Sequence, residues 1–73
     1  MIEGGSWTVL DGQGRTVGQI DGDEFVRDGD RLIYRIDGDA IYSMDMPARL
    51  VAFVEGAMAT TPQGAVFLRF VAD

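Results

Sequence analysis

Aspartates next to glycines are the residues of this chain best suited to chemistry. Asp-Gly-Asp triplets stand at 21–23, 28–30 and 37–39, and carboxylate oxygens are the ligands that Ca²⁺ prefers. An EF-hand loop also needs acidic residues at further alternate positions and a distant glutamate, and this spacing is absent from the sequence. Asp-Gly between alternating apolar segments is, in contrast, typical of hairpins with type I′ turns. We therefore expect turns at these triplets and no metal site.

The six arginines are the second group with binding chemistry, in a chain that has no lysine. Guanidinium forks suit carboxylates and phosphates, so Arg31, Arg35 and Arg69 are candidate anion-binding residues. The alternative is that the arginines pair with turn aspartates across neighbouring strands, while their aliphatic stems pack on the sheet. Because those acids compete for the same donors, the pattern favours pairing over an anion site.

The sequence lacks several of the residue types that most often act in catalysis. Histidine, cysteine and lysine are all missing, so the chain lacks a thiolate and the usual base that titrates near neutral pH. Ser6 and Ser43 consequently have no partner that would activate a hydroxyl. A pair of carboxylates for acid–base catalysis stays open because aspartates are plentiful, but nothing places two of them in a cleft. We expect a protein that is not an enzyme, with no catalytic residues and no cofactor.

Charge and size restrict the partners. Twelve acidic residues against six basic ones give a net charge of −6, which disfavours nucleic acid and anionic membranes and allows an acidic face that docks on a basic protein. The first residues carry no basic region of a secretory signal, so we expect the cytoplasm. The 73 residues make a single domain over 1–73, and a domain this small usually needs an additional source of stability. Without disulfides or metals, oligomerisation is the remaining source.

A turn motif repeats along the chain and predicts its organisation. An aliphatic residue, an acid and a glycine, followed two residues later by a residue that is usually apolar, start at Ile2, Ile20, Ile36 and Val54. Independently, residues 17–36 align without a gap on 51–70. We therefore predict an all-β antiparallel meander of about eight short strands from four hairpin repeats, forming a rolled sheet or small barrel. The expected strands are 6–10, 15–20, 24–27, 31–36, 40–43, 49–54, 58–61 and 65–71.

The segment 47–58 is the ambiguous part of this pattern. Pro47 suits the first turn of a helix, and Leu50, Val54 and Met58 recur at helical spacing. Taken alone, the segment fits a helix as well as a strand, which gives an α+β alternative with a helix near 47–56. The repeat alignment favours the strand.

Alternation along the strands predicts two dissimilar faces. The expected core face gathers Thr16, Gly18, Ile20, Leu32, Tyr34, Ile36, Leu50, Ala52, Val54, Val66, Leu68 and Phe70, joined by Trp7, Val9, Phe25 and Ile41. Gly18 has no side chain, so a neighbour such as Trp7 or Tyr34 would lie across it.

The opposite face mixes five of the six arginines with apolar residues and would expose an apolar patch if nothing covered it. The sheet rolling on itself, a second copy, or a different protein or ligand are three possible coverings. We predict a homodimer with the candidate interface residues Val51, Phe53, Phe67, Arg69 and Val71. Two alternatives remain: an acidic adaptor or inhibitor of another protein, as encoded by phages or mobile elements, and a small anion-binding module.

Two strings of the sequence resemble known repeats. Gly14–Asp23, echoed by Arg35–Tyr42, resembles the short tandem β-hairpin repeats of uncharacterised bacterial proteins, which follow a Gly-aliphatic-Gly-aliphatic-Tyr rhythm. Gly5–Gly12 is similar to WG-type β-repeats but lacks their Trp-Gly pair. The first resemblance covers residues 14–43. It implies a β-repeat fold and assigns no functional residue.

Overall fold

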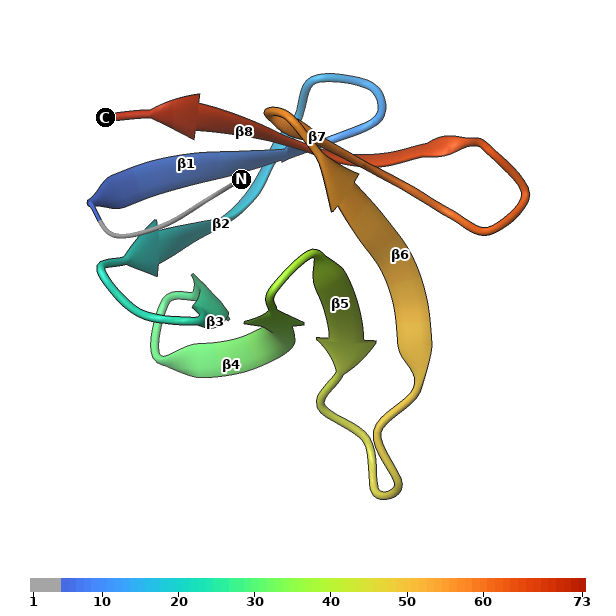
Figure 1. The fold of residues 1–73 in the computed structure, drawn as a ribbon. Coiled ribbons are helices and arrows are strands. Elements are labelled where there is room, and N and C mark those ends of the chain that lie inside the picture. Colours follow the sequence, from blue (N-terminus) through green and yellow to red (C-terminus); the bar gives the residue numbers. More distant parts are fainter. Residues whose placement is uncertain (1–4) are drawn as a thin grey trace.

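The chain folds into a closed barrel of eight antiparallel strands. In a computed structural model that describes residues 5–73, each strand pairs with the next one along the chain, and β8 pairs back with β1 (Figure 1). The strands are β1 (Ser6–Asp11), β2 (Thr16–Asp21), β3 (Phe25–Asp28), β4 (Arg31–Asp37), β5 (Ala40–Ser43), β6 (Leu50–Glu55), β7 (Met58–Thr60) and β8 (Val66–Ala72). The predicted all-β meander is confirmed, with each strand end within one residue of its expected place. Residues 50–55 form a strand, so the helical alternative is wrong.

A β-bulge recurs in all four hairpins of the barrel. In β1–β2, β3–β4, β5–β6 and β7–β8 the register slips by one residue at the same place in the second strand. The residues left without a direct partner are Val17, Ile33, Val51 and Phe67. An extra residue in one strand reverses the alternation of side chains on one side of it relative to the other. The shared bulge shows that the four hairpins are one structural unit repeated.

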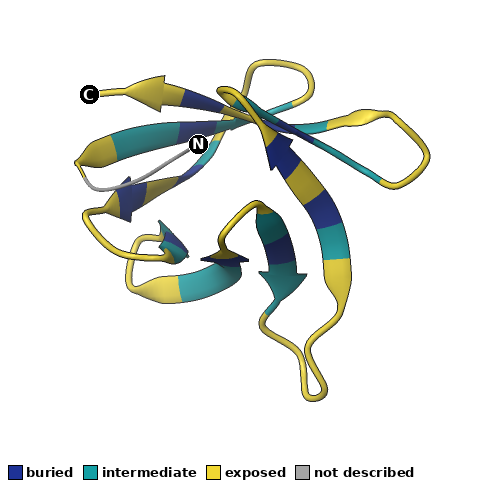
Figure 2. Cartoon of the chain, viewed as in Figure 1, coloured by how far each residue is buried: buried dark blue, intermediate teal, exposed yellow. Residues whose placement is uncertain are grey.

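The core lies inside the barrel and follows the predicted phase only after each bulge. Figure 2 shows buried bands alternating with exposed ones along β2, β6 and β8. The buried side chains are Val9, Ile20, Val26, Ile36, Ile41, Ala52, Val54, Ala59, Leu68 and Phe70. Before the bulge the prediction was wrong, because the phase is reversed there. Thr16, Leu50 and Val66, expected in the core, are exposed.

The four bulge residues, expected on the outer face, turn inward instead. Val17, Ile33, Val51 and Phe67 are partly buried and pack against the core. Tyr34 joins them, and its ring meets the Phe67 ring edge-on, with 5.4 Å between centroids and 73° between planes. Because β4 and β8 stand on opposite sides of the barrel, this contact crosses the interior. The bulges therefore put apolar side chains across the end of the barrel next to the hairpin loops.

One loop differs in length from its equivalents, and this difference moves a core position. The connection between β2 and β3 has three residues, whereas β4–β5 and β6–β7 are joined by two. The extra residue shifts the inward position of β3 by one, so Val26 is buried. Phe25, expected in the core, is half-buried on the outer face, where the Arg27 guanidinium lies 6.0 Å from its ring centroid.

The corner glycines confirm the predicted turns but not their type. Gly22, Gly38 and Gly56 all have positive φ angles, of 78°, 65° and 64°. In the two-residue turn Gly38-Asp39 only the glycine has a positive φ, because no non-glycine residue among residues 5–73 has one. A type I′ turn requires a positive φ at both central residues, so this turn is not type I′. The first copy of the motif, at Ile2–Gly4, lies outside the described residues.

Gly18 marks the closest approach in the barrel wall. A Cβ atom built on Gly18 would overlap the carbonyl oxygen of Arg27 and lie 3.1 Å from Cγ1 of Val26. The atoms nearest to this position belong to β3, and not to the expected neighbours Trp7 and Tyr34. β2 and β3 pair at only two positions, Gln19 with Arg27 and Ile20 with Val26.

Candidate interaction surface

Outward-facing residues of the four hairpins occupy equivalent places and can be compared directly. At the middle outer position of the long strands, two residues after each bulge, the four units carry Gln19, Arg35, Phe53 and Arg69. Three of these are polar, so the fold does not require an apolar side chain there. Phe53 is nevertheless 42% exposed. An exposed aromatic ring that the scaffold does not need is a candidate for contact with another molecule.

Phe53 belongs to a set of exposed apolar residues on neighbouring strands. Leu50 lies on the same strand, and the bulge at Val51 turns Leu50 to the same outer face. Phe53 pairs with Thr60 of β7, and Thr60 pairs with Val66 of β8. Leu50 is 42% and Val66 37% exposed. We call Leu50, Phe53, Val66 and the adjacent half-buried Tyr42, which pairs with Leu50, the apolar patch.

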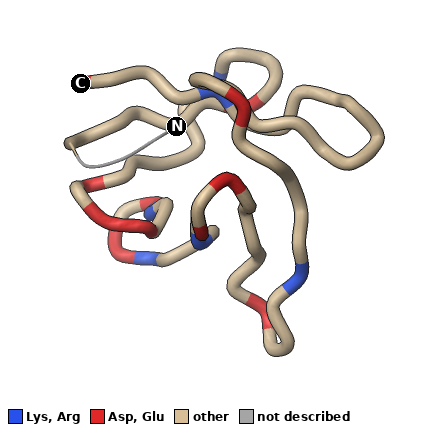
Figure 3. Tube along the Cα trace, in the orientation of Figure 1, with Lys and Arg blue, Asp and Glu red and all other residues tan. Residues whose placement is uncertain are grey.

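The charge distribution sets this patch apart from the rest of the barrel. Seven of the twelve acidic residues lie between positions 21 and 39. Figure 3 shows them along the β2–β3, β3–β4 and β4–β5 turns, whereas β6, β7 and β8 carry few charges. Five of the seven thus lie at the turns on either side of β3, away from β6–β8, whereas the turn that holds Asp37 and Asp39 adjoins β6, where Val54 N–H donates to the Asp39 carbonyl. Repulsion between two copies would be weakest through the β6–β8 side.

The five predicted interface residues do not form one surface. Phe53 belongs to the apolar patch, whereas the bulges turn Val51 and Phe67 onto the core. Val71 is half exposed but pairs with Thr8 of β1, toward the other end of β8, and Arg69 lies between Met58 and Leu10. Leu50 and Val66, which the structure exposes, were expected in the core. Two adjacent apolar residues interrupting strict alternation, as in Leu50-Val51 and Val66-Phe67, were the signal that could have revealed them.

The three candidate anion-binding arginines are not brought together. Arg31 and Arg35 stand on β4 and Arg69 on β8, across the barrel. The Nε atom of Arg35 lies 3.3 Å from a Glu24 carboxylate oxygen, and its Nη2 atom lies 3.5 Å from Asp37. The donors of Arg35 are thus engaged by neighbouring acids, as the pairing alternative supposed.

The aspartates of the turns serve local structure. Two Arg27 nitrogens bind both oxygens of Asp23, at 3.0 and 2.5 Å, and this hydrogen bonding lowers the pKa of the Asp23 carboxyl. Asp11 accepts backbone hydrogen bonds from Arg15 at 3.0 Å and Gln13 at 2.8 Å, which lower the pKa of its carboxyl. Within residues 5–73 no three carboxylates gather in a way that could hold a metal ion.

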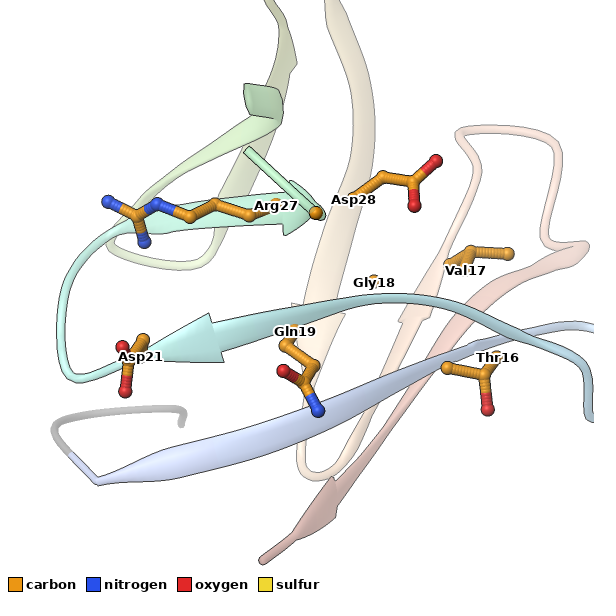
Figure 4. A pocket seen from close by; sticks show the side chains of 8 residues that line it. Thr16, Val17, Gly18, Gln19, Asp21, Arg27 and Asp28 are labelled. Carbon is orange, nitrogen blue, oxygen red and sulfur yellow. The ribbon is translucent and has the colours of Figure 1, made fainter. Parts of the chain in front are cut away.

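A groove of about 330 Å³ opens beside the short β2–β3 seam. Its lining comprises Thr16, Val17, Gly18, Gln19, Asp21, Arg27, Asp28 and Gly29. Figure 4 shows the side chains of Arg27 and Asp28 extending in opposite directions, with Gln19 and Thr16 pointing away from both. Since Arg27 is also held by Asp23, the polar groups of this groove do not converge on a common ligand atom.

Comparison of the chain with known protein families, with curated proteins and with solved structures found no match. The resemblance to bacterial β-hairpin repeats therefore stays a prediction. Residues 5–73 contain no helix that could cross a membrane. Of the surface features described for these residues, the apolar patch is the one that the fold itself explains least, which makes it the candidate interaction surface.

Proposed function

We propose that this protein is a non-enzymatic β-barrel module that self-associates through the apolar patch. The observation that supports this proposal best is Phe53, an exposed aromatic ring at a position where the other three hairpins carry glutamine or arginine. Leu50 extends the apolar surface along β6, and Val66 lies on β8, beyond Thr60 of β7. A patch that faces itself across a twofold axis needs no second partner.

Size supports the same proposal. A standard interface buries roughly 800 Å² on each partner, which is about a sixth of the 4625 Å² surface of this chain. Small domains gain stability from oligomerisation when disulfides and metals are absent. Covering the apolar patch removes exposed hydrophobic area from water, the main driving force of association.

The test is the oligomeric state of two matched variants. Phe53→Asp places a charge in the centre of the proposed interface, and Gln19→Asp places the same charge at the equivalent position of the first hairpin. Loss of a buried aromatic contact weakens association by about 1.5–3 kcal/mol, roughly 10–100-fold in Kd. We expect sedimentation velocity to show a dimer for the wild-type chain and Gln19→Asp, and a monomer for Phe53→Asp at the same concentration.

Two results would overturn the proposal. A wild-type chain that stays monomeric at high micromolar concentration has no self-association to explain. A dimer that Phe53→Asp and Gln19→Asp weaken equally responds to charge and not to the patch. Far-ultraviolet circular dichroism of both variants shows whether the barrel itself is preserved.

A further inference from the structure

The loop between β5 and β6 carries a methionine side chain out into solvent. The loop spans residues 44–49 and is the longest of the four hairpin loops, and it extends beyond the strands (Figure 1). All of its residues are exposed (Figure 2). Met46 is 97% exposed, so its thioether is open to small solutes from almost every direction and adds almost nothing to the packing of the barrel.

The other two methionines among residues 5–73 are more protected. Met44, at the base of the loop, is 40% exposed and lines a groove together with residues of β4. Met58 is half-buried on β7, in register between Glu55 of β6 and Arg69 of β8. The fold therefore exposes three chemically identical thioethers to very different degrees.

Hydrogen bonds close the base of the loop without involving Met46. The Ser43 N–H donates to the Arg49 carbonyl at 2.8 Å, and the Arg49 N–H donates to Ser43 Oγ at 3.0 Å. The buried core of the barrel does not include Met46 either. A change of polarity at this side chain consequently leaves both the loop base and the core in place.

We propose that Met46 is a site of reversible oxidation by hydrogen peroxide in the folded protein. Its sulfur attacks one peroxide oxygen, so that an S–O bond forms as the O–O bond breaks. The hydroxide that leaves takes the proton of the transferred oxygen and becomes water. Sulfur loses two electrons and the peroxide gains them, so no further reactant is needed. The product is methionine sulfoxide, a polar group that methionine sulfoxide reductases return to the thioether.

Three features favour Met46 for this chemistry. The chain has no cysteine, so no thiolate competes for the peroxide. Oxidation of a core methionine disrupts packing, whereas the oxidised form of Met46 can stay folded because its side chain lies in solvent. A reductase must enclose the sulfoxide, and a loop tip that stands clear of the barrel can enter an active site. The inference is independent of the proposed self-association, because Met46 lies outside the apolar patch.

The first experiment measures oxidation rates at each methionine in dilute hydrogen peroxide, at a concentration where the chain is monomeric. Mass spectrometry of tryptic peptides, with fragmentation of Ile36–Arg49, separates Met44 from Met46. Rates in the urea-unfolded chain provide the reference. Folding should leave the Met46 rate almost unchanged and slow Met58 at least about tenfold, with Met44 in between. Equal protection of Met46 and Met58 would overturn the proposal.

The second experiment tests whether the modification is reversible and leaves the fold intact. A brief treatment that adds the first oxygen should leave the midpoint of urea unfolding unchanged. Reductases for both sulfoxide epimers, supplied with dithiothreitol, should then restore the original mass of the folded protein. The matched control is Met46→Leu, which should lack the early gain of oxygen on Ile36–Arg49. A lowered midpoint, or an oxygen that the reductases leave in place, would contradict the proposed site.

Discussion

At the scale of single residues, the barrel interior is filled by side chains of unequal size at equivalent positions. The inward residue that directly follows each bulge is Gly18, Tyr34, Ala52 or Leu68. A closed wall can accept a large residue in one unit only if another unit supplies a small one. Gly18 is the smallest member of this set, and a Cβ atom at this position would overlap the Arg27 carbonyl oxygen. Its lack of a side chain is therefore a packing requirement.

We expect Gly18→Ala to destabilise the fold. The new methyl group would overlap the Arg27 carbonyl oxygen, and backbone cannot move aside as a flexible side chain can. Overpacking of this kind costs about 1–3 kcal/mol, to be measured by urea denaturation. Gln19→Ala, at the neighbouring exposed position, is the control and should change the unfolding free energy by less than about 0.5 kcal/mol. A Gly18→Ala protein as stable as the control would contradict the close approach.

Acid should weaken the fold through Asp11 and Asp23. Their hydrogen bonds lower both carboxyl pKa values below the ordinary 3.8, so the ionised forms are favoured in the folded state. The stabilisation is complete above pH 3.8 and is lost as the pH falls through the lower folded pKa. Asp11→Asn keeps an oxygen acceptor but cannot titrate, so its unfolding free energy should fall less between pH 5 and pH 2 than that of the wild type.

The matched control for the pH experiment is Asp30→Asn. Asp30 is an exposed turn acid whose side chain forms no hydrogen bond or ion pair within the described residues. Its replacement removes one negative charge without removing a hydrogen bond, so it shows the effect of the charge alone. Equal slopes for Asp11→Asn and the wild type would show that the Asp11 hydrogen bonds do not persist in solution.

At the scale of the elements, the recurrent bulge decides which apolar residues serve the fold. The sequence pattern predicted the strands and their order because glycine corners and alternation are local signals. Alternation was applied along the whole of each long strand, and the slip at Val17, Ile33, Val51 and Phe67 depends on how the partner strand is aligned. Residues after the bulge were assigned to the correct face, whereas Thr16, Leu50 and Val66, which directly precede it, were placed in the core and are exposed. For this reason the predicted interface included Val51 and Phe67, which pack on the core.

Two phenylalanines, one on β6 and one on β8, distinguish a residue that stabilises the fold from one that faces outward. Phe67 packs on the core and against Tyr34, so Phe67→Ala should lower the unfolding free energy by about 1–3 kcal/mol, somewhat less than for a fully buried ring. Phe53 faces outward, so Phe53→Ala should change the stability of the monomer by less than about 0.5 kcal/mol. Both are measured by denaturation at concentrations where the chain is monomeric. Similar losses in the two variants would contradict the bulge at Phe67.

At the scale of the whole molecule, closure of the barrel shows which face of the sheet is covered by rolling and which face stays in solvent. Rolling of the sheet buries ten apolar side chains inside the barrel, and among the described residues no polar side chain is buried. The outer face remains in solvent and divides into an acidic side near β2–β4 and the apolar patch on β5–β8. Composition alone could not predict this division, because it depends on which outer positions adjoin after the pairing of β8 with β1 closes the circle.

That closure limits how a partner can be recognised. Every strand between Ser6 and Ala72 has a neighbour on both sides, so the wall offers no free margin onto which a foreign strand could be added through main-chain hydrogen bonds. Strand addition is also the step by which β proteins nucleate fibrils. A closed ring of strands has no unpaired edge strand on which a fibril could begin. A partner that binds residues 5–73 is therefore expected to contact side chains and loops, and not to extend the sheet.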